Sequence, residues 1–152
     1  MPALSLAIAT VMSILTFTTS GISDCGTNSL FSIVSQSFAP ATPVAGDNVS
    51  WTITYKVPAV VPIESAYSIN SGIVNGFIPI DPTKSDLCGV VDCPIVEGEY
   101  TTTNYQVWPD GLAGSKIALT SQWVDAANDE LLCSKVVVTG KQTLRGRVGS
   151  GN

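Results

Sequence analysis

The sequence contains no histidine and few charged residues. Its 152 residues include 7 Lys+Arg and 12 Asp+Glu, so charged residues make up 12% of the chain, about half the share of an average globular domain. Without histidine the chain cannot form a serine or cysteine triad with a histidine base, most zinc hydrolase sites or an imidazole pH switch. The net charge of −5 argues against a nucleic-acid partner, because the phosphate backbone would repel the protein.

The N-terminal region also lacks charge, since no charged side chain precedes Asp24. The apolar run from Leu4 to Phe17 is shorter than the about 20 residues that a membrane-spanning helix needs. It is typical of a secretory signal peptide, and small residues stand just before Asp24 as a cleavage site. We predict a signal peptide at residues 1–23 and secretion or delivery to the endolysosomal or vacuolar lumen. Because the signal has no Lys or Arg before its apolar run, an uncleaved anchor is the alternative.

The predicted mature chain contains all 4 cysteines: Cys25, Cys88, Cys93 and Cys133. An even number of cysteines in an exported chain predicts disulfides, here two with three possible pairings. A bridge between Cys88 and Cys93 would close a short local loop, and Cys25 would then be linked to Cys133. A zinc site is the alternative, but this spacing without histidine argues against it.

Alternation of apolar and polar residues predicts an all-β domain. The clearest strands are Asn48–Val57, Lys116–Asp125 and Leu131–Thr139. Weaker candidates are Leu30–Ser37, Ser65–Val74, Phe77–Ile80 and Tyr100–Val107. Proline and glycine fall between these runs. About seven short strands without helical periodicity indicate an antiparallel β-sandwich. We expect one domain over residues 24–139, followed by a basic, glycine-rich tail at 140–152 that is disordered.

Few of the polar residues are candidates for a catalytic or metal-binding site. Carboxylates gather in two loop-like segments, 92–99 and 125–130, where we interpret them as solvated. We therefore predict no catalytic residue, no metal site and no cofactor. Asn48-Val49-Ser50 is a glycosylation sequon, so Asn48 is a candidate acceptor.

Four motifs in order resemble a known family. Asp24-Cys25-Gly26 opens the predicted mature chain, and P-A-T-P-V-A-G-D-N-V-S-W runs from Pro40 to Trp51. C-x4-C-P covers Cys88 to Pro94, and Trp123-Val124-Asp125 precedes Leu131-Leu132-Cys133. This combination resembles the MD-2-related lipid-recognition (ML) domain family, and is most similar to Niemann–Pick type C2 sterol carriers and fungal phosphatidylglycerol/phosphatidylinositol transfer proteins.

The resemblance implies an immunoglobulin-like sandwich whose two sheets part to hold a lipid. It also implies the pairing Cys25–Cys133 and Cys88–Cys93. The sterol carriers have a third disulfide in the first loop, and the corresponding segment Val34–Gly46 contains no cysteine. This difference favours the phospholipid-transfer branch.

The candidate lipid-binding residues are large apolar side chains expected to point inward. Phe77 is included because it matches a pocket aromatic of the sterol carriers in the resemblance. The alternative is that these residues form ordinary sandwich core. The predicted set is Trp51, Ile53, Tyr55, Ile69, Phe77, Ile117, Leu119, Trp123, Val136 and Val138.

Together these features predict a monomeric, secreted lipid-binding or lipid-transfer protein. It would hold a sterol or phospholipid between two sheets, touch membranes transiently and perform no chemistry. The alternative is an extracellular recognition or adhesion module that binds through its surface, for example through the loop Trp108–Gly114.

Overall fold

The computed structural model of the protein describes residues 21–60 and 62–141. Within these ranges the chain forms eight strands and one turn of 3-10 helix, η1 (Leu87–Gly89). The strands are β1 (Ile22–Asp24), β2 (Ser32–Ala39), β3 (Asn48–Val57), β4 (Ala66–Val74), β5 (Ile78–Asp86), β6 (Gly98–Val107), β7 (Lys116–Asp125) and β8 (Glu130–Thr139). No helix in the described ranges is long and apolar enough to cross a membrane.

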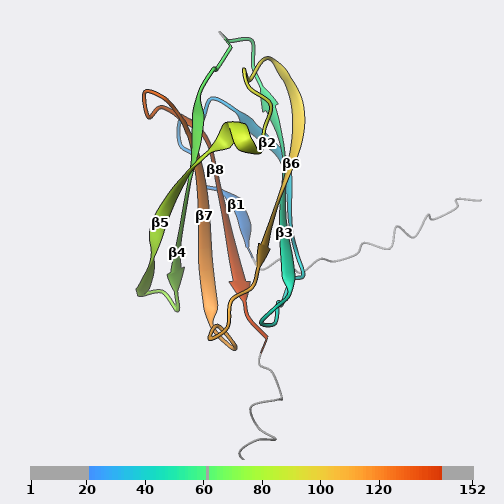
Figure 1. Ribbon diagram of the computed structural model, residues 1–152, viewed down its shortest axis with the longest axis vertical. Coiled ribbons are helices and arrows are strands. Elements are labelled where there is room, and N and C mark those ends of the chain that lie inside the picture. Colours follow the sequence, from blue (N-terminus) through green and yellow to red (C-terminus); the bar gives the residue numbers. More distant parts are fainter. Residues whose placement is uncertain (1–20, 61, 142–152) are drawn as a thin grey trace, which may run out of the picture.

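The strands pair into two antiparallel sheets that face each other (Figure 1). One sheet has the order β1-β8-β7-β4-β5 and the other has the order β2-β3-β6. The prediction of an all-β antiparallel sandwich is confirmed, with eight strands in place of about seven. Strands β3 and β7 have the predicted bounds, because strict alternation of β-branched and aromatic residues defines them at both ends.

Two strand predictions need correction. Strand β5 continues to Asp86, beyond the predicted end at Ile80, and its polar second half carries no alternation that could have revealed it. Strand β1 was not predicted, and it includes Ile22 and Ser23 of the predicted signal peptide. Residues 1–20 of that predicted peptide and residues 142–152 of the predicted tail lie outside the described residues.

Both predicted disulfides are present. Cys25 and Cys133 are 108 residues apart in the sequence, and their bond ties the segment after β1 to β8. Cys88 and Cys93 close the loop that contains η1. The pairing implied by the family resemblance is therefore confirmed.

The sandwich interior has two differently packed halves. In one half, Tyr55 stacks on Phe31 with ring centroids 5.6 Å apart and meets the edge of Trp123 at 5.0 Å. Buried aliphatic side chains complete this cluster. The other half centres on Ile117 and contains Phe38, Val49, Trp108, Val136 and Val138. Trp51 packs against both clusters and lies between them.

Strand β5 forms one edge of the five-stranded sheet and is exposed along its whole length (Figure 1). Its free edge carries Pro79 and Pro82, which cannot donate backbone hydrogen bonds, together with charged Asp81 and Lys84. Such residues discourage pairing with another sheet. The edge can therefore stay exposed beside the sandwich interior.

A tight turn joins β4 to β5. Asn75 and Gly76 both have positive φ, 52° and 83°, and the Phe77 backbone N–H donates to the Val74 carbonyl at 3.2 Å. This is the type I′ geometry that Asn-Gly favours in hairpins. The Asn75 side chain also accepts a hydrogen bond from the Lys116 backbone N–H at 3.0 Å, which fixes the hairpin tip to β7.

Candidate functional site: a cavity between the sheets

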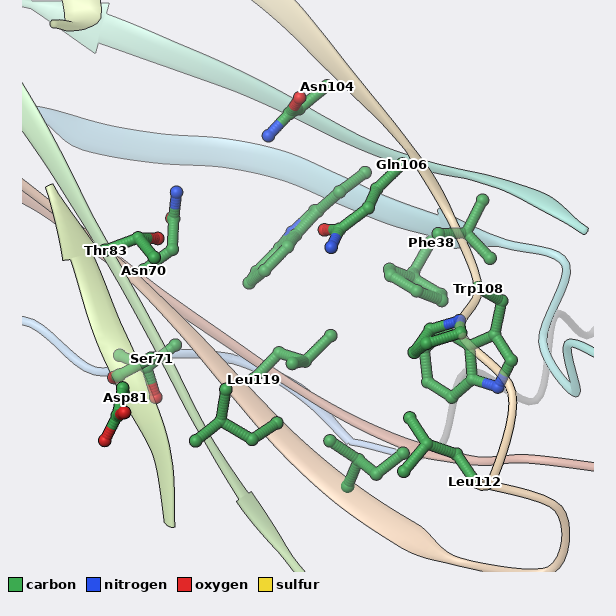
Figure 2. A pocket seen from close by; sticks show the side chains of 16 residues that line it. Phe38, Asn70, Ser71, Asp81, Thr83, Asn104, Gln106, Trp108, Leu112 and Leu119 are labelled. Carbon is green, nitrogen blue, oxygen red and sulfur yellow. The ribbon is translucent and has the colours of Figure 1, made fainter. Parts of the chain in front are cut away.

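A cavity of about 290 Å³ lies between the two sheets, in the half that contains Ile117. This volume is close to the lower end of the range of about 300–1,000 Å³ for small-molecule sites. The cavity is lined by Phe38, Val49, Trp51, Asn70, Ser71, Ile80, Asp81, Thr83, Asn104, Gln106, Trp108, Pro109, Leu112, Ile117, Leu119 and Thr120 (Figure 2).

The lining changes from apolar to polar across the cavity. Figure 2 shows Phe38, Trp108 and Leu112 gathered at one end and Asn70 with Thr83 at the other. Phe38 and Trp108 are buried, at 4% and 5% exposure. Exposed polar side chains from the two edge strands form the rim: Asp81 and Thr83 on β5, and Asn104 and Gln106 on β6. The cavity therefore has a buried apolar floor and a polar opening between β5 and β6.

The cavity exists because β4 and β6 reverse the usual pattern of a sandwich strand: small or polar residues face the interior and larger apolar residues face outward. On β6, Asn104 and Gln106 point inward, whereas Tyr105 and Val107 point to solvent and are 66% and 63% exposed. On β4, small or polar residues point inward at 68, 70 and 72. These side chains cannot fill a sandwich interior, which normally holds large apolar side chains across about 10 Å. The unfilled space is the cavity.

Gly72 lies where the cavity wall has no room for a side chain. A β-carbon on Gly72 would lie 2.9 Å from the Ile80 side chain and 3.2 Å from that of Leu119. A larger residue at this position would push both lining side chains into the cavity. Glycine therefore preserves the space.

A second, small cavity of about 40 Å³ lies on the far side of Trp51. Three residues line both cavities: Trp51, Asn70 and Asn104. Trp51 and Asn104 are direct partners in the β3–β6 ladder. These three side chains form a constriction between the main cavity and the filled half of the sandwich.

The sequence profile of the ML domain family matches residues 19–139, which is most of the chain. The chain belongs to the ML domain family. A relative from Dictyostelium discoideum bears the name "Putative phosphatidylglycerol/phosphatidylinositol transfer protein 2". It is 30% identical over 126 residues, which cover 77% of this chain and 83% of the relative.

A solved structure shares the ML domain fold. The crystal structure of a Niemann–Pick type C2 protein from the Japanese carpenter ant superposes with a TM-score of 0.64 over 80% of this chain and 99% of the ant protein. The two sequences are 10% identical. At this identity the match shows a shared sandwich architecture.

Half of the predicted binding residues line the cavities of this ML domain. Trp51, Ile117 and Leu119 line the main cavity. Trp51, Ile53 and Trp123 line the small one. Their strong alternation on β3 and β7 placed them on the inner face correctly.

Three predicted residues point inward but form core beside the cavities. Val136 and Val138 are buried on β8 beside Leu119 and Ile117, their ladder partners on β7. Tyr55 is buried in the aromatic cluster, where burial raises the pKa of its phenol and a hydrogen bond with Thr102 partly opposes that rise. These three residues are buried and line neither of the two cavities.

The expected inward positions of Ile69 and Phe77 are wrong. Ile69 pairs with Gln122 on the outer face of the five-stranded sheet. The large apolar residues of β4 lie on that outer face. Its inner face carries small or polar residues, which leave space for the cavity. Phe77 lies at the tip of the β4–β5 hairpin with 75% exposure and lines neither cavity.

None of the four rim residues was among the predicted site residues, and part of the floor was also absent from that set. Asn104 and Gln106 were not candidates, because polar residues on a strand usually face solvent. Trp108 stood outside the predicted strands. A large aromatic residue directly before Pro109 was the available signal, because an isolated tryptophan in a loop usually packs into a cavity or an interface.

The carboxylates near the β7–β8 turn have structural partners. The Asp125 side chain accepts hydrogen bonds from the backbone N–H groups of Ala127 at 2.9 Å and Asp129 at 3.0 Å. Glu130 accepts from the Ser29 hydroxyl at 2.9 Å and from the Gln122 amide at 3.2 Å. These carboxylates shape the turn and its neighbourhood.

Proposed function

We propose that this ML domain is a secreted or lumenal lipid-binding and lipid-transfer protein that performs no chemistry. The observation that supports this most strongly is the apolar cavity between the sheets, with its polar opening at the β5–β6 edge. The cavity is suited to a sterol or to an acyl chain of a phospholipid. The name of the Dictyostelium relative, a phosphatidylglycerol/phosphatidylinositol transfer protein, supports a phospholipid.

The energetics of transfer fit such a cavity. Removing apolar surface from water contributes about 25 cal/mol per Å², and a bilayer offers the same contribution. A carrier therefore needs only comparable apolar contact and an opening through which the chain can pass. Phe38, Trp108 and Leu112 provide that contact, and the space between β5 and β6 provides the opening.

We also propose that the protein meets membranes with the hairpin tip beside the opening. Phe77, Ile78 and Ile73 are 75%, 48% and 45% exposed on the β4–β5 hairpin. Ile80 continues this apolar surface into the cavity lining. Exposed apolar groups that adjoin a binding site are typical of a docking surface, and a tip fixed by the Asn75–Lys116 hydrogen bonds can enter the lipid headgroup layer as a unit.

The surface-recognition alternative has weaker support. It predicts binding through an exposed apolar or aromatic patch, with the loop Trp108–Gly114 as one example. Trp108 is buried in the cavity floor instead, with its exposed fraction at 5%. Asn48 is exposed at the start of β3, and we keep it as a proposed glycosylation acceptor.

Blocking the opening tests the proposed function. Thr83 is exposed and lines the cavity, so Thr83→Trp fills the entrance without disturbing the core. We expect wild-type protein mixed with phosphatidylcholine–cholesterol vesicles to carry lipid after separation, and Thr83→Trp to carry at least about tenfold less, since losing a buried chain's contacts costs well over 1.4 kcal/mol. The readout is lipid quantified per mole of re-isolated protein.

Lys84→Trp is the matched control, because Lys84 is the next residue on β5 and lies over the Tyr67 ring on the outer face, 4.5 Å from its centroid. It should load lipid as the wild type does. Equal loading of Thr83→Trp and wild type would reject the cavity as the lipid site.

A further inference from the structure

Strand β6 forms a free edge of the three-stranded sheet without the features that protect the other sheet edges in the described part of the protein. Strand β1 is only 3 residues long, β2 has a register shift between Ile33 and Ser35, and β5 carries prolines and charges. From Tyr100 to Val107, β6 contains no proline, glycine or charged residue and is rich in threonine and tyrosine. Such a segment at a sheet edge tends to pair with another chain.

The outer face of β6 becomes apolar toward the C-terminal end of the strand. At its centre the Thr103 hydroxyl lies 3.0 Å from that of Thr52 on β3, within hydrogen-bond distance. Tyr105 and Val107 follow on the same face and are both exposed. These two apolar side chains lie beside the free edge and would strengthen its pairing with another chain.

The glycosylation sequon lies directly beside these two side chains. In the β3–β6 ladder, Asn48 is the partner of Val107, and Ser50 is the partner of Tyr105. All four side chains face outward, because the alternate position Val49 is buried in the interior. Directly opposite β-carbons in an antiparallel pair lie about 4.5–5.5 Å apart and diagonal ones about 7–8 Å. A sugar on the Asn48 amide would therefore contact both apolar side chains.

We infer that an N-linked glycan at Asn48 covers the exposed end of β6 and keeps the protein monomeric. The apolar C–H face of its first sugar packs on Tyr105 and Val107. The following sugars extend across the free edge, since β6 lies only one strand spacing, about 4.8 Å, from β3. The inference rests on the secretory location in the proposed function and does not depend on the lipid.

The glycan comes from a donor of the secretory pathway, a lipid-linked oligosaccharide pyrophosphate. A bond forms between Asn48 Nδ2 and the anomeric carbon of the first sugar, and the bond from that carbon to the pyrophosphate oxygen breaks. The lipid pyrophosphate leaves, and one proton of the amide passes to solvent. Asn48 is exposed at the start of β3, as an acceptor in a secreted protein must be.

Removing the glycan in two ways tests the inference. The full chain is expressed in a secreting eukaryotic host, and the intact mass gives the occupancy of Asn48. Asn48→Gln removes the acceptor, whereas Ser50→Ala removes the sequon and keeps the asparagine. By sedimentation velocity, we expect a monomeric wild type and an at least about tenfold higher association constant in both variants. Ser50→Thr keeps the sequon and should behave as the wild type does.

Two second-site variants locate the effect. Asn48→Gln/Tyr105→Lys places a charge on the exposed end of β6, as Lys84 does on β5, and should restore the monomer. Asn48→Gln/Leu30→Thr creates a new sequon that begins at exposed Asn28, which precedes β2 at the opposite end of the three-stranded sheet. This protein carries the same kind of glycan away from the exposed end of β6, so it should still self-associate.

Four outcomes would overturn the inference. Asn48 could be unoccupied in the secreted wild type, or Asn48→Gln and Ser50→Ala could both stay monomeric. A glycan at Asn28 that restores the monomer would indicate a general gain in solubility in place of local cover. Self-association that persists with Tyr105→Lys would indicate another surface.

Lipid loading separates this inference from the proposed function. Asn48 lines neither cavity, so the unglycosylated variants should load lipid from phosphatidylcholine–cholesterol vesicles as the wild type does. A wild type that is glycosylated and monomeric but carries no lipid would reject the proposed function and leave the inference standing.

Discussion

Removing the Cys25–Cys133 disulfide is expected to lower the free energy of unfolding by about 5 kcal/mol, and removing Cys88–Cys93 by about 2 kcal/mol. In the chain-entropy treatment, a crosslink stabilises by restricting the unfolded chain, and the effect grows with the logarithm of loop length. The first bond closes a loop with a separation of 108 residues, and the second closes one of 5. Five kcal/mol is comparable with the whole stability of many domains.

Paired alanine substitutions measure these two effects in urea. Cys25→Ala/Cys133→Ala should shift the unfolding midpoint far more than Cys88→Ala/Cys93→Ala, with similar slopes against urea. The second pair is the control, because it also replaces two cysteines but opens only a short loop. The entropic explanation is wrong if the short-loop pair costs as much as the long-loop pair. In that case local packing around η1 would contribute more than chain restriction.

The Phe77→Asp substitution is expected to reduce binding to phosphatidylcholine vesicles by at least about tenfold. Burying a phenylalanine side chain contributes about 1.5–3 kcal/mol, and every 1.4 kcal/mol changes an affinity tenfold. Phe77 is 75% exposed at the hairpin tip, so the folded protein loses little when the ring is replaced. Co-sedimentation with vesicles gives the affinity.

Val34→Asp is the matched control for this effect, because Val34 is also an exposed apolar residue, at 53%, and lies on β2 away from the hairpin. It should bind vesicles as the wild type does. Protein already loaded with lipid should keep that lipid in Phe77→Asp, because Phe77 does not line the cavity. Equal loss in both variants would indicate non-specific adsorption instead of docking through the tip.

The strands that the sequence predicts best are those whose inner face is almost entirely apolar. In β3 and β7, Ile53 and Ile117 belong to runs in which large apolar residues occupy the inner face, with Ser121 as the polar exception on β7. Alternation and burial agree there, so bounds and orientation were both predicted. The disulfide pairing followed from the family resemblance and agrees with the short loop between Cys88 and Cys93.

The sequence predicted a cavity between the sheets but few of its polar lining residues. Patterning assigns apolar residues to the interior, whereas part of this cavity is lined by polar residues. Ile69 and Tyr105 are apolar and face outward, whereas Asn70 and Asn104 are polar and line the cavity. A pattern-based reading assigns the apolar residues to the interior. Only the sheet register, set by the pairing of β4 with β7 and of β6 with β3, shows which face is inside.

The hairpin tip could have been predicted from local chemistry. Asn75-Gly76 between two apolar runs is a strong signal for a two-residue turn. Recognising it would have placed Phe77 at a turn, where a side chain is usually exposed. The resemblance to a pocket aromatic in the sterol carriers led to the opposite expectation.

Native mass spectrometry of the disulfide-bonded protein, purified without detergent from a secreting eukaryotic host, tests the central proposal most directly. The cavity between the sheets has a volume of about 290 Å³ and an apolar floor, so we predict a complex of one chain with one lipid whose mass identifies the species. The same complex should form after incubation with phosphatidylcholine–cholesterol vesicles. Protein that shows only the mass of the bare chain in both preparations would contradict lipid carriage between the sheets.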